Sequence, residues 1–252
     1  MTVLIGLDLA WSSRNPTGAV LLAPTSGGGF EVREHTRLGG DDELVPWVLE
    51  RAGAGPAVVA VDAPLVAPNP PGTSRPVDRE VTRLFARQHA GAYPGNRERC
   101  ARPVELAARF CRRGWSVDPS VRGARRRVLL EVYPHAAGVR LFGLERIVKY
   151  KKGPVEERRV GLARFQRLLH ERLPRLDPPV RPFPRERVAE LRGRALKDLE
   201  DRLDAVVCAA MAARFAHAPE RCEVLGDVAT GYVVVPRDES GDGSVRARRR
   251  KG

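Results

Sequence analysis

The chain has 252 residues, enough to bury one full hydrophobic core as a single domain, or as one domain with a large insertion. Hydrophobic residues make up 42% of the sequence and charged residues 30%, which is typical of a folded soluble protein. No run approaches the roughly 18 apolar residues that a membrane-spanning helix needs. The N-terminus lacks a signal-peptide pattern, because Asp8 interrupts its first apolar run. We therefore expect a cytoplasmic protein without a membrane partner, and the sequence leaves open whether it forms a homodimer.

The net charge of +13 admits two explanations. Arginine could be abundant only because the coding sequence is rich in G and C, or the charge could serve a polyanionic partner, whose phosphates release counterions when they are neutralised. Clustering favours the second explanation, since residues 97–127 contain ten arginines and three acids. We expect a nucleic acid, DNA or RNA, as the partner. The predicted contacts are Arg125, Arg126 and Arg127, with Lys149, Lys151 and Lys152 holding phosphate or forming a solvated basic loop.

The first third of the chain predicts an ordered series of elements. Apolar runs at residues 3–9 and 19–23 and an alternating segment at 30–36, typical of an edge strand, are joined by short turns. This pattern indicates an antiparallel meander of three strands. Acids at the start of residues 41–51 favour a helix there. An unbroken apolar run at residues 57–61 is typical of a strand that is buried on both faces. This β-β-β-α-β order opens the RNase H-like fold, in which the fourth strand runs parallel to the first.

The rest of the chain completes an α/β domain over residues 1–236. Residues 68–127 form a basic insertion, partly helical around 77–88 and 104–113. A fifth strand is expected at 128–132, helices at 155–172 and 186–216 with a break near Gly193, and an extra C-terminal strand at 231–236. Residues 237–252 are expected to be a disordered basic tail. The predicted fold class is thus an RNase H-like mixed five-stranded sheet flanked by helices.

Four aspartates lie in or beside predicted strands and helices, where a carboxylate must be paired or bind a cation. Asp8 interrupts the first strand, Asp62 ends the fourth, and Asp204 precedes a long apolar helical run with Asp201 one turn earlier. If the first and fourth strands are parallel neighbours, Asp8 and Asp62 emerge side by side. Each aspartate alone is more simply explained as a cap, a turn former or a solvated residue.

Together these acids predict a metal site. Mg²⁺ and Mn²⁺ take oxygen ligands, and two such ions can clamp a phosphodiester. Asp8, Asp62, Asp204 and Asp201 are the predicted ligands. Asp8, Asp62 and Asp204 are also the predicted catalytic residues, and Glu131 either completes the set or holds the turn at Tyr133.

Six motifs of the sequence resemble successive motifs of the DUF429 family. They are GLDLAW at 6–11, VDAPL at 61–65, EVYP at 131–134, KYKKG at 149–153, DRLDA at 201–205 and GYVVVP at 231–236. The resemblance implies a predicted nuclease of RNase H fold. The DRLDA motif also resembles the closing motif of RuvC-type Holliday-junction resolvases, in which acids of the first strand, a middle strand and this helix bind the metals. That resemblance assigns metal binding to Asp8, Asp62 and Asp204, with Asp201 adjoining.

The leading hypothesis is therefore a Mg²⁺- or Mn²⁺-dependent nuclease that hydrolyses phosphodiester bonds by a two-metal-ion mechanism. A non-catalytic nucleic-acid-binding protein on the same fold is the alternative. An ATP-dependent phosphotransferase is less well supported, because Leu9, Ala10 and Trp11 follow Asp8 where such proteins carry Gly and Thr residues for phosphate.

Overall fold

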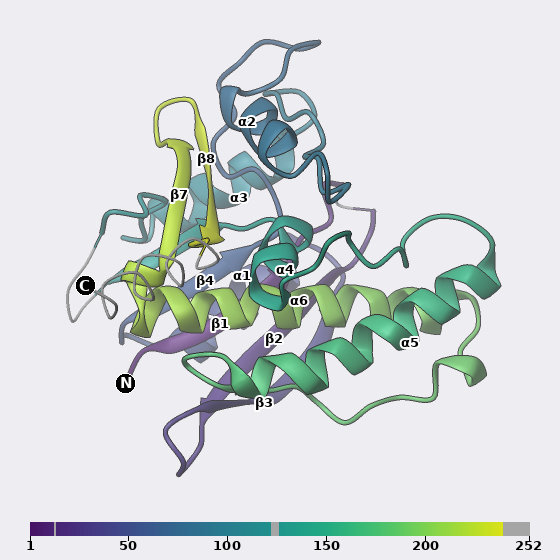
Figure 1. The fold of residues 1–252 in the computed structure, drawn as a ribbon. Coiled ribbons are helices and arrows are strands. Elements are labelled where there is room, and N and C mark those ends of the chain that lie inside the picture. Colours follow the sequence, from purple (N-terminus) through teal and green to yellow (C-terminus); the bar gives the residue numbers. More distant parts are fainter. Residues whose placement is uncertain (13, 122–125, 239–252) are drawn as a thin grey trace, which may run out of the picture.

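A six-stranded mixed sheet forms the centre of the computed structural model, which describes residues 1–12, 14–121 and 126–238 (Figure 1). The strand order is β5-β4-β1-β2-β3-β6. The strand bounds are β1 Val3–Asp8, β2 Thr17–Pro24, β3 Phe30–Leu38, β4 Ala57–Val61, β5 Arg127–Glu131 and β6 Val180–Arg181. Strands β1, β2 and β3 form the predicted antiparallel meander, and β4 pairs parallel to β1 and to β5. The predicted mixed α/β architecture is confirmed.

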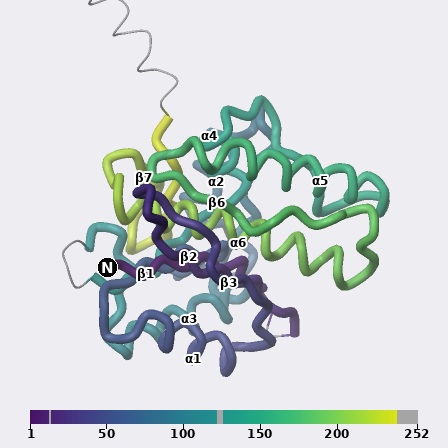
Figure 2. Tube along the Cα trace, turned by 90° about the horizontal axis from the view of Figure 1, so that it is seen from below, coloured from purple at the N-terminus to yellow at the C-terminus, as the bar shows by residue number. Residues whose placement is uncertain are grey.

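Helices cover both faces of this sheet (Figure 2). Their bounds are α1 Asp41–Ala52, α2 Pro76–Leu84, α3 Ala101–Cys111, α4 Pro134–Phe142, α5 Val155–Arg172 and α6 Gly193–His217, with 3-10 turns at Leu173–Arg175, Val188–Glu190 and Pro219–Arg221. Helices α1 and α3 lie on one face, and α6 with α4 and α5 on the other. None of the helices in the described ranges is long and apolar enough to cross a membrane.

Alternation along the strands assigns each side chain to a face. In β1, Leu4 packs in the core under α6, whereas Ile5 and Leu7 pack in the core under α1 and α3. In β4, Val58 and Ala60 take the α6 face and their neighbours the other. Successive residues of a strand point to opposite faces, so the even-numbered positions of β1 and β4 face α6.

The predicted sheet lacks one strand. The observed sheet has a sixth strand, β6, whose two residues pair with β3. The extra C-terminal strand is confirmed as β8 (Gly231–Pro236), which pairs with β7 (Cys222–Asp227) in an antiparallel hairpin, and its Val234 forms a single parallel bridge with Val132, just after β5. Residues 231–236 thus form a strand as predicted. The strand that pairs with them, β7, shows little strand pattern in its own sequence.

The hairpin packs on the segment predicted as a basic insertion. Val77, Val81 and Phe85 of the α2 region form a small core with Leu225 and Val233 of β7 and β8. The insertion is thus anchored through its own apolar contacts. Of the predicted tail, Arg237 donates its backbone N–H to Arg221 O (2.8 Å), and residues 239–252 lie outside the described part.

Candidate active site

Two of the predicted carboxylates meet at one edge of the sheet. Asp8 is the last residue of β1 and Asp62 follows β4, whose Val61 is in register with Leu7. The backbone N–H of Asp62 donates to Leu7 O at 2.8 Å, so the two strand ends are locked together. Both positions are even-numbered, and both side chains therefore lie on the face that α6 covers.

Glycines bring α6 close enough to join them. A Cβ atom on Gly6 would lie 2.1 Å from Ala205 O and 2.2 Å from Ala209 N, so only glycine allows this contact between helix and strand. Gly18 makes the same kind of approach to Asp201 O, at 2.4 Å. These contacts hold the acidic turn of α6 directly over the ends of β1 and β2.

Asp8 and Asp62 are close enough for each to shift the pKa of the other. Desolvation raises the pKa of Asp62 to about 7, while the Lys151 ammonium opposes the rise and Asp204 adds to it. Desolvation also raises the pKa of Asp8 well above its usual value, again opposed by Lys151. The pair therefore holds a proton near neutral pH.

Asp204 is fully buried and faces two donors from a single loop, residues 143–154. The Tyr150 hydroxyl donates to Asp204 Oδ1 at 2.5 Å, and Lys151 Nζ lies 2.8 Å from Oδ2. The pKa of Lys151 is raised well above its usual value, because Asp204 and Asp8 outweigh the desolvation that would lower it. Lys151 is thus a charged ammonium among three aspartates.

Asp201 lies on the outer side of this cluster. Its Oδ1 is 2.7 Å from Lys197 Nζ and its Oδ2 is 3.9 Å from Arg37 Nε. Asp201 and Asp8 line one pocket of about 300 Å³, together with Trp11. Asp201 therefore reaches the same opening as Asp8, but it is held by two cations.

A second pocket, of about 580 Å³, is lined by the loop that carries Lys151. Tyr133, His135 and Tyr150 line it with Lys151 and Lys152. Desolvation lowers the pKa of His135 to about 4 and raises that of Tyr133 to about 12, so both are neutral at pH 7. The cluster thus adjoins two openings, one beside Trp11 and one beside His135.

The carboxylate oxygens of these aspartates suit a divalent cation. In this structure, however, they are arranged around the Lys151 ammonium. Carboxylate oxygens at partly or fully buried positions are the ligands that a hard cation would take. Within the described residues, however, no three His, Cys, Asp or Glu side chains are arranged as a metal site. Asp8 and Asp62 end neighbouring strands, whereas Asp204 faces Lys151.

Glu131 is placed apart from the aspartates. Arg75 Nη1 and Nη2 donate to its two oxygens at 2.8 and 2.6 Å, and Leu65 N–H donates to Oε2 at 3.0 Å. Burial raises the pKa of Glu131, and the guanidinium opposes that rise. Glu131 is in register with Val61, on the face opposite Asp62. These contacts favour the structural alternative, in which Glu131 anchors the segment after β4.

The predicted basic contacts are divided between two ends of the sheet. Lys149 and Lys152 are exposed near Lys151, on the side of the carboxylates. Arg126 and Arg127 lie at the start of β5, paired with the start of β4, and donate to Ala216 O and Gly53 O. A five-residue strand, about 16 Å, therefore separates them from Asp62. Arg125 lies outside the described residues.

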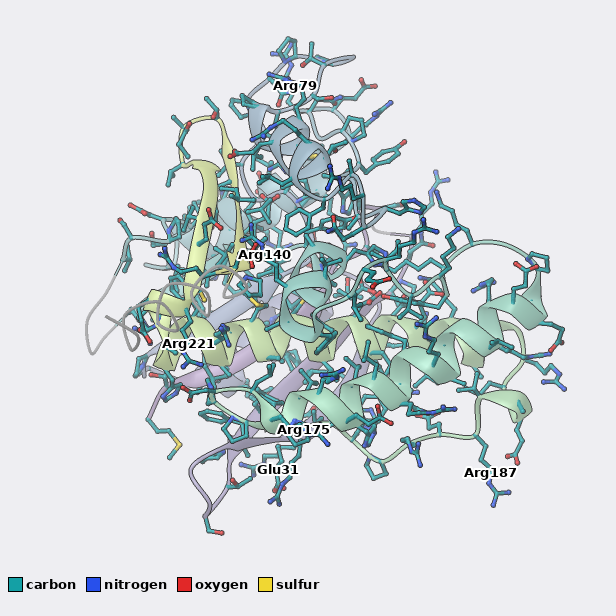
Figure 3. The ribbon with its side chains drawn as sticks, in the orientation of Figure 1. Glu31, Arg79, Arg140, Arg175, Arg187 and Arg221 are labelled. Atoms are coloured by element: carbon teal, nitrogen blue, oxygen red, sulfur yellow. The ribbon has the colours of Figure 1, made fainter. Side chains whose placement is uncertain are left out.

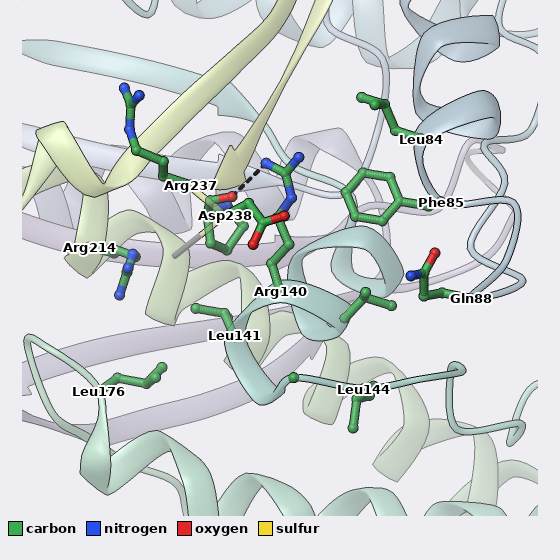
Figure 4. Close-up of a pocket in the computed structure, with 13 residues that line it drawn as sticks. Leu84, Phe85, Gln88, Arg140, Leu141, Leu144, Leu176, Arg214, Arg237 and Asp238 are labelled. Carbon is green, nitrogen blue, oxygen red and sulfur yellow. Dashed lines mark hydrogen bonds between the residues drawn. The ribbon is translucent and has the colours of Figure 1, made fainter. Parts of the chain in front are cut away.

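Arginine is also spread over the rest of the surface. Figure 3 shows Arg79, Arg175 and Arg187 projecting from separate parts of the molecule. A further pocket, of about 470 Å³, is lined by Arg140, Arg214 and Phe85 at the junction of α2, α4 and β8 (Figure 4). Arg140 is engaged by Glu223 Oε2 (2.5 Å) and Pro236 O (2.8 Å), and the pocket contains none of the predicted acids.

Sequence reasoning missed Tyr150 and Lys197 as partners of the aspartates. Lys197 was detectable, because it precedes Asp201 by four residues on one helix. Tyr150 was not, because its contact with Asp204 joins residues 54 apart in the chain.

Comparison with known proteins gives one match. Residues 6–230 match the family described as "Protein of unknown function (DUF429)". No curated protein and no solved structure matches the chain.

Proposed function

The chain belongs to the DUF429 family, whose function is unknown, and we therefore propose from the site that it is a metal-dependent nuclease hydrolysing phosphodiester bonds in DNA or RNA. The observation that carries the proposal is the convergence of Asp8, Asp62 and Asp204 from two strand ends and one helix. A cytoplasmic location and a homodimer remain predictions.

Asp8 and Asp62 are the residues that would hold Mg²⁺ or Mn²⁺ first. Their carboxyl groups end neighbouring strands and have raised pKa values, and a cation bound between them would take the place of a proton. Asp204 would join them by giving up its contact with Lys151, and Asp201 by giving up Lys197. A bound ion of this kind supplies an activated water and neutralises charge on the phosphate.

Side chains of the protein supply the remaining functions. Tyr150 fixes the orientation of Asp204 by donating to Oδ1, and it is itself stacked on Phe165 with ring centroids 4.5 Å apart. The Lys151 ammonium could leave Asp204 and bind a phosphate oxygen instead, because an ammonium binds either anion. His135 lines the second pocket as a neutral imidazole at pH 7, where it can hydrogen-bond to a ligand.

A second candidate, non-catalytic nucleic-acid binding, is favoured by one specific observation. Lys151 already lies within 2.8 Å of Asp204 and so partly neutralises the cluster without a metal ion. In that case the carboxylates would be a structural ion-pair network, and the exposed basic residues alone would hold the nucleic acid.

Cleavage assays separate the two candidates. The parent and Asp8→Asn are incubated with Mn²⁺ or Mg²⁺ and a panel of branched, duplex and single-stranded DNA and RNA. Asp42→Asn is the matched control, because Asp42 is a fully exposed aspartate of α1, on the opposite face of the sheet from Asp204 (Figure 2), and its ion pair is with Arg109. The nuclease proposal requires cleavage by the parent and by Asp42→Asn, and none by Asp8→Asn or in EDTA. Nucleic-acid binding by the parent without cleavage of any substrate establishes the second candidate.

A further inference from the structure

An exposed aromatic pair stands at the edge of the carboxylate cluster. The side chain of Tyr93 is 64% exposed, more than any other aromatic residue in the described ranges. Its ring meets that of Trp11 edge to face, with centroids 5.9 Å apart and planes at 71°. An edge-to-face contact occupies a face of only one of the two rings. Trp11 also packs against the core and the Arg99 guanidinium lies over the Tyr93 ring, so a third planar group would stack on the ring surface that these contacts leave open.

Trp11 connects this pair to the acids. It lines the pocket of about 300 Å³ that also contains Asp8 and Asp201. Only Leu9 and Ala10 separate it from Asp8, so their Cα atoms are at most about 11 Å apart. A planar group stacked on Trp11 would therefore lie at the same opening as Asp8.

Positive charge accompanies the rings. The Arg99 guanidinium lies over the Tyr93 ring, 5.3 Å from its centroid. Arg99 donates to Pro94 O at 3.4 Å and is exposed, as is its neighbour Arg97. Such an arginine can contact a phosphate while it stacks on an aromatic ring, which suits a nucleotide better than an uncharged ligand.

We propose that Trp11 and Tyr93 form a stacking platform for an unpaired base of the substrate, so that the protein acts on single-stranded or unpaired nucleic acid. The inference rests on the proposed function for the chemistry at Asp8, but the platform itself concerns binding alone. Bases within a duplex are stacked on their neighbours and cannot offer a face, whereas every unpaired base can. The phosphate next to the stacked base then faces the carboxylates.

Fluorescence anisotropy in EDTA tests the platform without any cleavage. The probes are 5′-labelled oligo(dT) and oligo(U) of about 12 nucleotides and a blunt duplex of the same length. Tyr93→Ala should bind both single strands about 5- to 100-fold more weakly than the parent, the range that one stacked base contributes, and should bind the duplex as the parent does. Tyr93→Phe, which keeps the ring, should bind within about twofold of the parent.

Two controls keep the result interpretable. Val160→Ala removes an exposed apolar side chain from α5, 71% exposed, and should not change binding. Thermal melts show whether Tyr93→Ala is folded, which its exposure predicts. Unchanged single-strand binding by folded Tyr93→Ala, or an equal loss on duplex, overturns the platform even if the parent cleaves. Selective loss on single strands establishes it even if the parent cleaves nothing, in which case the nuclease proposal alone fails.

Discussion

Replacing Lys151 by Met should destabilise the metal-free protein and increase its response to metal. The ammonium is 2.8 Å from fully buried Asp204 and lies among three carboxyl groups. Removing one partner of a buried ion pair costs about 3–5 kcal/mol, because the other charge stays buried. Lys151 keeps 31% of its side chain exposed, so we expect the lower end, about 3 kcal/mol.

Thermal melts in EDTA measure this effect. For a domain of this size, about 3 kcal/mol corresponds to a fall in Tm of about 6–12 °C. Lys152→Met makes the same chemical change at an exposed position and should shift the Tm by less than about 2 °C. Adding Mn²⁺ should then raise the Tm of Lys151→Met more than that of the parent, because the ion no longer competes with an ammonium for Asp204.

The reasoning fails if Lys151→Met melts within about 2 °C of the parent in EDTA. That result would mean that Lys151 does not neutralise the cluster. A full loss of stability with no rescue by Mn²⁺ or Mg²⁺ would mean that Lys151 is a structural partner and that the cluster binds no metal.

The remaining predictions concern pH, packing and salt. Because folding raises the pKa of Asp62 from 3.8 to about 7, the bound proton stabilises the native state fully below pH 3.8, and this stabilisation is lost as the pH rises through 7. Between about pH 8 and pH 5.5, the metal-free parent should gain about 2 kcal/mol over Asp62→Asn in denaturant titrations, and parallel pH curves would refute the shift. Gly6→Ala should lower stability by at least about 3 kcal/mol because its Cβ would overlap α6, whereas Gly27→Ala, which meets nothing within 4 Å, should be near neutral in the same titrations. Neutralising Lys149 and Lys152 together should reduce the slope of log Kd against log salt on single strands by about 1.4, and an unchanged slope would place the phosphate contacts elsewhere.

The sequence predicted the centre of the fold because its elements carry strong local patterns. The meander, the helix at 41–52 and the buried strand at 57–61 follow from apolar runs and turns. Helix α4 was missed although Pro134 begins it and Gly143, in a left-handed conformation, ends it, both of which are ordinary helix signals. Strand β6 has two residues and no pattern of its own, because its pairing depends on the tertiary position of β3.

The candidate site was predictable in part for a similar reason. Carboxylates that interrupt apolar strands can be recognised locally, and alternation along β5 could have placed Glu131 on the wrong face for the cluster. Lys151 could be singled out only as part of a basic loop, because its contact with Asp204 joins residues 53 positions apart. The separation of Arg126 from the acids likewise depends on strand direction, which composition does not encode.

The close contact of α6 with Gly6 limits how the site can adjust to a ligand. Asp8 and Asp62 end neighbouring strands, and Asp204 belongs to a helix that touches those strands backbone to backbone, so none of the three can shift without the core. The backbone beside Lys151 is held as closely, since a Cβ atom on Gly161 of α5 would lie 1.8 Å from Lys149 O, but the Lys151 side chain is long and 31% exposed. Any adjustment of the site to an incoming ligand must therefore come from this one side chain, while the positions of the aspartates limit the size of the ligand that fits between them.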